Sequence, residues 1–294
     1  MPDLSKAHRL GPHVVGHRVV VRRVVPGETG PSGGPALTDL LGICVRWSDG
    51  ECVVQPESGP AVTIPVGLIV SGKPVPPRPS PRFRADPREC QLRALALWPD
   101  LVTEPLGDWL LRRSATSTAR RANSVLAFGP AGVPDAYERV LDFYARPVAN
   151  VLPDSPEDAF FRERGWVTEG HDADTVLMLA SVARVVRGLP GDLPPARLDR
   201  SGPGLVRATV DDVAVGFAGY ADDWVGFRSL EVEETHRGHG LALAVMSALV
   251  EWGAAQGATT AYLQVLGDNA PARRLYEGMG FTPHHTYRYL TPAT

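Results

Sequence analysis

The chain has 294 residues, 44% of them hydrophobic, and a formal net charge of −3. This length allows two or three domains with a core in each, and so small a net charge gives no whole-chain argument for nucleic-acid binding. The apolar runs fall short of the roughly 18 residues of a membrane span, the N-terminus lacks the apolar centre of a signal peptide, and the three cysteines lack metal-ligand spacing. We therefore expect a cytoplasmic protein with reduced thiols and no metal.

Residues 1–78 are expected to form a small all-β module. A β-branched run over residues 18–25 is followed by strands over 42–47 and 51–55, and Asp49-Gly50 between the last two is a strong hairpin signal. Short strands with tight turns predict a barrel that resembles SH3 or Tudor-like modules in architecture. Since no Tyr or Phe precedes Phe83, we expect no aromatic cage. The favoured role is packing against a neighbouring domain or binding of an unidentified partner, for which a protein is a candidate and nucleic acid is less favoured.

Six prolines between Lys73 and Arg88 predict an extended spacer, so we place a domain boundary near residue 78. Residues 79–190 then show a mixed α/β pattern. Helices are expected over 89–98, 134–145 and 155–164, the last with Ser155 as its N-cap. Strands are expected over 108–113, 123–128, 148–152 and 175–180.

A second linker is expected over residues 187–200, where glycine and proline are frequent, and it introduces a domain over 191–294. Its expected strands are 205–210, 213–220, 224–232, 261–266 and 286–290, and its helices are 241–255 and 269–277. Asp268 or Asn269 is the expected cap of the last helix.

The two regions repeat one pattern. Shifting the chain by 115 places Phe281 on Trp166, Gly280 on Gly165 and Tyr276 on Phe161, which predicts two related folds in tandem. The strand-to-helix turn of the first copy, residues 129–134, contains two prolines and so offers few N–H groups. We interpret the first copy as structural, or as one wall of a substrate cleft.

The corresponding turn of the second copy is Arg237-Gly238-His239-Gly240-Leu241-Ala242. An apolar strand, a glycine turn and a helix form an anion site, because the first helical N–H groups have no partner within the helix and its dipole favours negative charge there. A dinucleotide site is disfavoured because Leu243 stands where a third glycine or alanine would be needed, and a phosphate-binding P-loop is excluded because no Gly-Lys-Ser/Thr follows.

At this point the residues resemble the GNAT superfamily of N-acetyltransferases. The glycine hexapeptide satisfies that family's acetyl-CoA signature, and Asn269, Tyr276 and Gly280-Phe281 match its downstream pattern. The close match covers about the last 75 residues of the chain. The whole layout, a small β-module ahead of an α/β tandem of GNAT copies with mixed sheets, is similar to uncharacterised actinobacterial acetyltransferases.

The resemblance implies that acetyl-CoA is the co-substrate and that a primary amine attacks it directly in a ternary complex. Backbone N–H groups of Arg237, Gly238, His239, Gly240, Leu241 and Ala242 would hold the pyrophosphate, and Asn269 would contact the coenzyme. Leu230 and Val232 would pair with the pantetheine arm where the fourth and fifth strands splay. Tyr276 would protonate the departing thiolate.

The general base is left open between Glu231, Glu233, His284, His285 and a water. Glu231 is the first choice, because its depth in the strand predicts burial and a raised pKa. The acidic rim that includes Asp222 and Asp223 favours a cationic acceptor. A different class remains open: a non-catalytic CoA-binding regulatory or scaffold protein whose β-module binds a protein or nucleic-acid partner.

Overall fold

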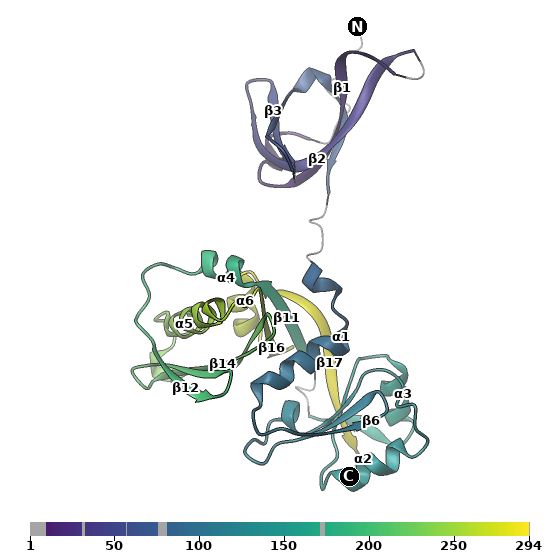
Figure 1. Cartoon of the computed structure of the whole chain (residues 1–294), viewed down its shortest axis with the longest axis vertical. Coiled ribbons are helices and arrows are strands. Elements are labelled where there is room, and N and C mark those ends of the chain that lie inside the picture. Colours follow the sequence, from purple (N-terminus) through teal and green to yellow (C-terminus); the bar gives the residue numbers. More distant parts are fainter. Residues whose placement is uncertain (1–9, 31–32, 57, 76–80, 171–173, 294) are drawn as a thin grey trace. The chain divides into compact units, whose positions relative to one another are not determined.

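A computed structural model describes residues 10–293 apart from 31–32, 57, 76–80 and 171–173. The chain divides into two compact units, Met1–Pro79 and Ser80–Thr294 (Figure 1). The centre of the expected proline-rich spacer, residues 76–80, lies outside the described residues. No helix in the described part of the chain is both long and apolar enough to cross a membrane.

The first unit is one antiparallel sheet with the strand order β4-β3-β2-β1-β5. Its strands are β1 (Arg18–Thr29), β2 (Pro35–Ser48), β3 (Glu51–Pro56), β4 (Val62–Pro65) and β5 (Ile69–Pro74). Its core contains Val19, Val21, Cys44 and Ile64. The strand pairings of the described residues leave β4 and β5 at opposite edges, so they show an open sheet and not the expected closed barrel.

The second unit contains one sheet of twelve strands. The strands of its first half are β6 (Val102–Leu106), β7 (Trp109–Arg113), β8 (Val125–Ala127), β9 (Ala149–Val151), β10 (Trp166–Thr168) and β11 (Thr175–Ser181). Those of its second half are β12 (Arg197–Gly202), β13 (Leu205–Val210), β14 (Ala214–Ala221), β15 (Trp224–Val232), β16 (Thr260–Leu266) and β17 (Thr282–Pro292). The helices are α1 (Pro87–Arg93), α2 (Ala136–Phe143), α3 (Pro156–Arg162), α4 (Val182–Gly188), α5 (Leu241–Ala255) and α6 (Ala270–Gly278).

The two halves exchange their last strands, so the sheet continues from one half into the other. β11 pairs with β16 and β17, while β17 pairs with β11, β9 and β10. Six consecutive residues of β11, 175–180, are buried. A strand that is apolar on both faces needs neighbours and cover on both sides, and its central place between β16 and β17 supplies them. The two copies therefore share one continuous sheet.

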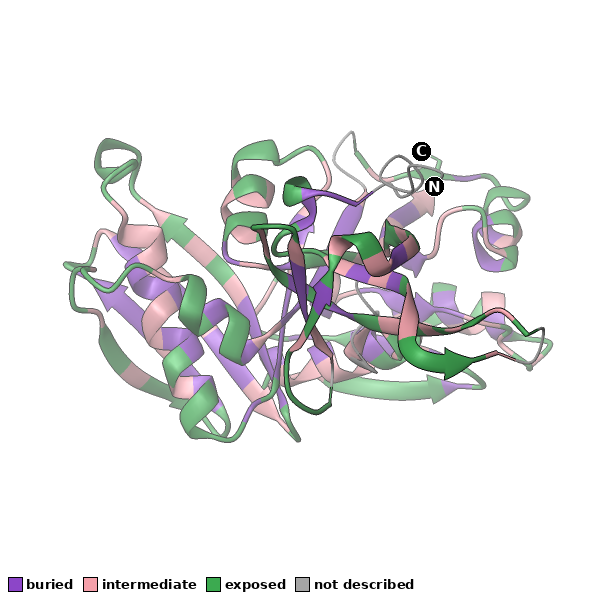
Figure 2. Ribbon diagram, turned by 90° about the horizontal axis from the view of Figure 1, so that it is seen from above, coloured by how far each residue is buried: buried purple, intermediate pink, exposed green. Residues whose placement is uncertain are grey.

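Each face of this sheet has its own core. On one face α5 packs through Val245 and Leu249 against β13, β14 and β15. On the other face the turn after α1, Ala94–Leu97, lies over β14 and β15. A Cβ on Gly219 of β14 would lie 2.8 Å from the Ala96 carbonyl oxygen, so the close approach of this turn depends on that glycine. Buried residues accordingly follow the strands between the covering helices (Figure 2).

The two ends of the segment expected to be a second linker, residues 187–200, belong to a helix and a strand. Residues 182–188 form α4 and residues 197–202 form β12 at the edge of the sheet, while Leu189 and Leu193 pack against the α5-side core. Residues 189–196, which contain all three prolines of the segment, form neither helix nor strand and connect α4 to β12. The connection is therefore shorter than expected.

Candidate functional site

The pairing between β15 and β16 stops halfway along the two strands. Their parallel register runs from Trp224 and Thr260 to Phe227 and Leu263, whereas β15 continues to Val232 and β16 to Leu266. A bulge explains the separation, because the β14–β15 register shifts between Arg228 and Glu231. Within it Ser229 has φ = 51°. A bulge bends the strand that carries it, so β15 turns away from β16 and the strands splay.

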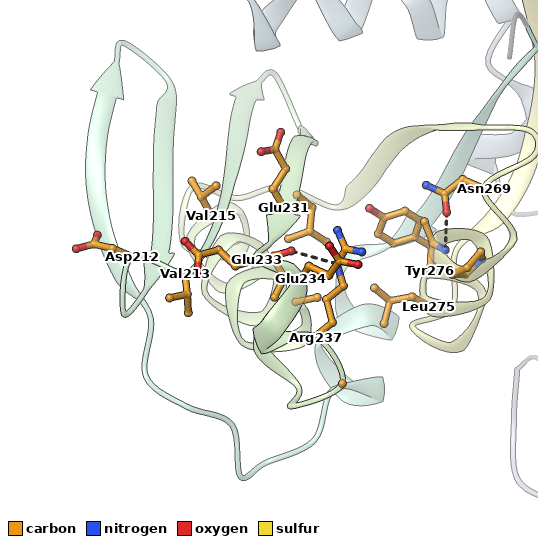
Figure 3. A pocket seen from close by; sticks show the side chains of 16 residues that line it. Asp212, Val213, Val215, Glu231, Glu233, Glu234, Arg237, Asn269, Leu275 and Tyr276 are labelled. Carbon is orange, nitrogen blue, oxygen red and sulfur yellow. Dashed lines mark hydrogen bonds between the residues drawn. The ribbon is translucent and has the colours of Figure 1, made fainter.

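A cleft of about 980 Å³ lies at this splay (Figure 3). It is bordered by the end of β15, the turn before α5, the start of α6 and the tip of the β14 hairpin. Its lining residues include eight of the eleven expected from the sequence: Leu230, Glu231, Val232, Arg237, Gly238, Ala242, Asn269 and Tyr276. The other three, His239, Gly240 and Leu241, lie in the turn between Gly238 and Ala242.

The glycine turn has the geometry of an anion site. Gly238 and Gly240 have φ of 82° and 76°, and Gly240 is the N-cap of α5. An added Cβ would meet nothing within 4 Å at Gly238 and only Leu193, at 3.9 Å, near Gly240, so the glycines are needed for their left-handed conformation and not for space. No side chain caps α5 and none in its first turn is acidic. The free N–H groups and the helix dipole are thus available to an anion, without competition from a capping or acidic side chain.

Arg237 attaches this turn to the splayed strand. Its Nε donates a hydrogen bond to the Val232 carbonyl oxygen at 3.2 Å. The expected phosphate contacts therefore begin directly beside the strand end expected to bind pantetheine.

Asn269 and Tyr276 close the other side of the cleft. Asn269 Oδ1 accepts a hydrogen bond from the Ala272 N–H at 3.1 Å, which makes it the N-cap of α6 (Figure 3). Tyr276 lies two turns further along α6 and packs edge-on against Phe281, with ring centroids 6.1 Å apart. Burial raises the pKa of Tyr276, and the nearby charge of Arg121 opposes that rise. The phenol therefore keeps its proton at neutral pH and is able to donate it.

The carboxylates of the cleft are more exposed than the sequence predicts. Leu230 and Val232 pack against the α5-side core, so Glu231 between them projects to the opposite face of the sheet. Glu231, Glu233 and Glu234 are all exposed, so the burial expected of Glu231 is absent. The bulge that opens the splay turns this end of β15 away from β16, while it stays paired with β14.

The two candidate histidines lie away from the cleft lining. His285 Nε2 is 3.2 Å from the Gln91 side-chain nitrogen, and its ring packs edge-on to Phe128. Burial and the neighbouring His284 lower the pKa of His285 to about 3, and burial lowers that of His284. An imidazole with so low a pKa is a weak base at neutral pH, so the geometry does not favour His285 as the base.

One residue near the site was missed by the sequence analysis. Arg121, in the loop between β7 and β8, donates from Nε to the Tyr287 hydroxyl at 3.3 Å and from Nη2 to the Gln264 carbonyl oxygen at 3.4 Å. Gln264 is the first β16 residue beyond the last β15–β16 pair. The one available signal was the polar run of residues 114–121 in a largely apolar region.

The corresponding place in the first copy is closed. β8 and β9 are paired along all three of their residues, so they do not splay. Trp109 Nε1 donates to the Gly129 carbonyl oxygen at 2.7 Å, and the Asp108 N–H donates to that of Ala131 at 3.2 Å. These bonds fix the turn of residues 129–134 onto the β6–β7 hairpin. A smaller cavity of about 350 Å³ remains, lined in part by Trp109, Tyr137 and Phe160.

Sequence comparisons relate the chain to acetyltransferases. Residues 189–290 match the family model described as "Probable histone acetyltransferase Rv0428c C-terminal". Over 307 aligned residues the chain is 26% identical to "Probable histone acetyltransferase Rv0428c" of Mycobacterium tuberculosis, covering 94% of this chain and 95% of that protein. It is 38% identical over 77 residues to "Uncharacterized N-acetyltransferase YobR" of Bacillus subtilis, a match that covers 26% of this chain and 31% of that protein.

A solved structure shows the same fold. A GCN5-related N-acetyltransferase from Kribbella flavida aligns with a TM-score of 0.53 at 16% identity, covering 70% of this chain and 95% of that one. A tandem GNAT protein from the clavulanic acid biosynthesis pathway aligns with a TM-score of 0.45 at 13% identity, covering 67% of this chain and 86% of that one.

Proposed function

We propose that this protein, which has a GNAT fold and a C-terminal GNAT-family domain, is an acetyl-CoA-dependent N-acetyltransferase acting on a primary amine. The observation that carries the proposal is the single cleft at the β15–β16 splay. It brings together the glycine turn, the free end of β15 and the Tyr276 phenol. An anion site, an unpaired strand edge and an acid are the three features needed to bind and cleave the thioester of a nucleotide coenzyme.

The donor would be held by backbone groups. The turn of residues 237–242 would bind the pyrophosphate through its N–H groups, and Asn269 would contact the coenzyme from the start of α6. Beyond Phe227 the β15 edge has no pairing with β16, so Leu230 and Val232 are placed to pair with an amide-bearing arm.

The chemistry is direct acyl transfer. A neutral amine nitrogen forms a bond to the acyl carbon, the carbon–sulfur bond breaks, and the Tyr276 hydroxyl gives its proton to the sulfur. The attacking nitrogen loses a proton, and Glu231, on the exposed side of β15, would accept it directly or through a water. Because Glu231 is exposed, the water-mediated route fits the structure best.

A cationic acceptor suits the charge of the rim. Asp212, Glu231, Glu233 and Glu234 all line the cleft, and a cluster of carboxylates attracts an ammonium group before it is deprotonated. The name of the Mycobacterium tuberculosis relative makes a lysine of a basic protein one candidate acceptor. Small-molecule amines are the other class.

The remaining parts of the proposal concern organisation. Residues 1–78 would act as a protein-binding module, residues 79–190 as a degenerate GNAT copy and residues 191–294 as the acetyl-CoA-binding copy, in a cytoplasmic enzyme without a metal.

The test is a binding measurement followed by a transfer assay. Calorimetry with acetyl-CoA should give a one-to-one complex, and release of free CoA thiol should depend on an added amine. Binding without transfer to any amine, peptide or basic protein would instead favour a CoA-binding regulatory or scaffold protein. Absence of binding would rule out both.

A further inference from the structure

Arg121 brings a charge from the first copy to the active-site end of the second. It lies in the loop between β7 and β8, and its guanidinium bonds to Tyr287 and to the Gln264 carbonyl oxygen, 3.3 and 3.4 Å away. At Gln264 the pairing between β15 and β16 has already ended. The guanidinium therefore lies beside the opening between the two strands.

The guanidinium lies on the face of the sheet opposite α5. The Gln264 side chain accepts a hydrogen bond from the Tyr287 hydroxyl at 2.5 Å, and Tyr287 belongs to the core on that face. Glu231 projects to the same face, since its neighbours Leu230 and Val232 pack on the α5 side. A donor bound by the glycine turn at the start of α5 and an acceptor meeting these two side chains would approach the splay from opposite faces.

The charge of Arg121 has no carboxylate partner within the described part of the chain. The side chains that act on its charge there are the phenols of Tyr276, Tyr287 and Tyr289, none of which is a carboxylate. The adjacent Arg120, in contrast, is 3.4 Å from Glu169. The two hydrogen bonds of Arg121 use Nε and Nη2, which leaves the Nη1 donors for another group. A largely buried cation is costly unless an anion accompanies it.

We propose that Arg121 binds a carboxylate of the acceptor, so that the enzyme selects small amines in which an acid lies close to the amine, as in a free amino acid. The inference rests on the proposed acetyltransferase function and names its substrate class. Glu231 would attract the ammonium end of such a zwitterion and Arg121 its acid end. A guanidinium suits this task because it offers a planar pair of donors to the two carboxylate oxygens.

The experiment compares matched acceptors in wild type, Arg121→Met and Arg121→Lys. The acceptors are a set of amino acids, the α-amides of the same amino acids, and a lysine-rich peptide with blocked ends. Wild type should prefer each acid over its amide by about tenfold or more in kcat/KM, as expected for a charge-assisted pair. Arg121→Met should remove that preference, mainly by raising the KM of the acids, and Arg121→Lys should restore part of it. Arg113→Met, which removes an exposed charge from the same copy, should keep the preference.

Three results would overturn the inference. The first is a preference for the blocked peptide over every amino acid. The second is equal use of acids and amides by wild type. The third is an equal loss of kcat on acids and amides in Arg121→Met, which would assign Arg121 to the reaction and not to the acceptor. Unchanged acetyl-CoA affinity and melting temperature in the variants show that the fold and the donor site are intact.

Failure of the proposed function gives a different pattern. If no amine is acetylated, calorimetry of the same acids and amides on the CoA-bound protein decides the inference alone. Acids must then bind more tightly than amides, and the difference must vanish in Arg121→Met; equal affinities would overturn it.

Discussion

The two copies in residues 80–294 contain corresponding strands and turns, but the site is open in the second copy and closed in the first. In the second copy a bulge at Ser229 separates β15 from β16 and a glycine turn presents free N–H groups to the opening. In the first copy the equivalent strands stay paired, and Trp109 holds the equivalent turn through a hydrogen bond to the Gly129 carbonyl oxygen. The comparison shows that the fold alone does not make the cleft. The turn of the first copy also contains two left-handed glycines, Gly129 and Gly132. The copies differ instead in the inserted residue of β15 and in the hydrogen bond that holds the first turn to Trp109.

The closed copy still contributes to the open one. Its strand β11 lies between β16 and β17, and its loop supplies Arg121. The turn Ala94–Leu97, which follows α1, covers the second face of β14 and β15. Through Arg121 the first copy thus reaches the part of β16 where the pairing with β15 has ended.

The largest expected effect concerns the closed copy. Trp109 is buried, stacks on Phe161 at 5.3 Å between ring centroids, and bonds to the Gly129 carbonyl oxygen. Trp109→Ala should lower the free energy of unfolding by about 3–5 kcal/mol, as for other buried aromatic truncations. Denaturant unfolding followed by circular dichroism measures this. The acetyl-CoA affinity of the folded variant should stay within about twofold of wild type; a large loss would mean that the first copy holds the donor.

The second prediction concerns the open turn. Gly240→Asp should weaken acetyl-CoA binding by about a hundredfold or more, because it strains a left-handed position and adds a negative charge at the phosphate site. Gly132→Asp is the matched control, since Gly132 also has a left-handed φ, of 73°, in the turn of the first copy. Calorimetry with acetyl-CoA should separate the two variants. Equal losses in both would remove the distinction between the turns.

The sequence predicted the features that depend on local pattern. The span of α5, the glycine turn before it and the Asn269 cap follow from apolar periodicity and capping chemistry, which act within a few residues. The exchange of β11 and β17 was not predicted, because any exposed edge could pair with a two-faced apolar strand. Arg121 was missed for the same reason: its partners are 143 and 166 residues away in the chain.

The third prediction tests the acid. Tyr276→Phe should lower kcat by about 100-fold, the lower end of the range for loss of a proton donor, and leave the KM of acetyl-CoA nearly unchanged. Because burial raises the Tyr276 pKa above its usual value of about 10, the phenol stays protonated through pH 9. The wild-type rate should therefore show no loss from its ionisation between pH 6 and about 9. Tyr137→Phe, in the first copy, should leave kcat unchanged, and an unchanged rate in Tyr276→Phe would remove that residue from the mechanism.

The smallest expected effect concerns the bulge that distinguishes the two copies. Ser229 is exposed and has φ = 51°, a conformation that glycine adopts freely and a β-branched residue resists. Ser229→Val should cost about 1–2 kcal/mol of stability and lower acetyl-CoA affinity several-fold, because the strained residue favours a regular strand that pairs with β16. Ser229→Gly should change both by less than the valine variant does. If Ser229→Val leaves the acetyl-CoA affinity intact, α5 and α6 hold the strands apart and the bulge does not. If both variants lose acetyl-CoA affinity equally, the serine hydroxyl itself contributes, and the difference between the copies lies in a side chain and not in the backbone.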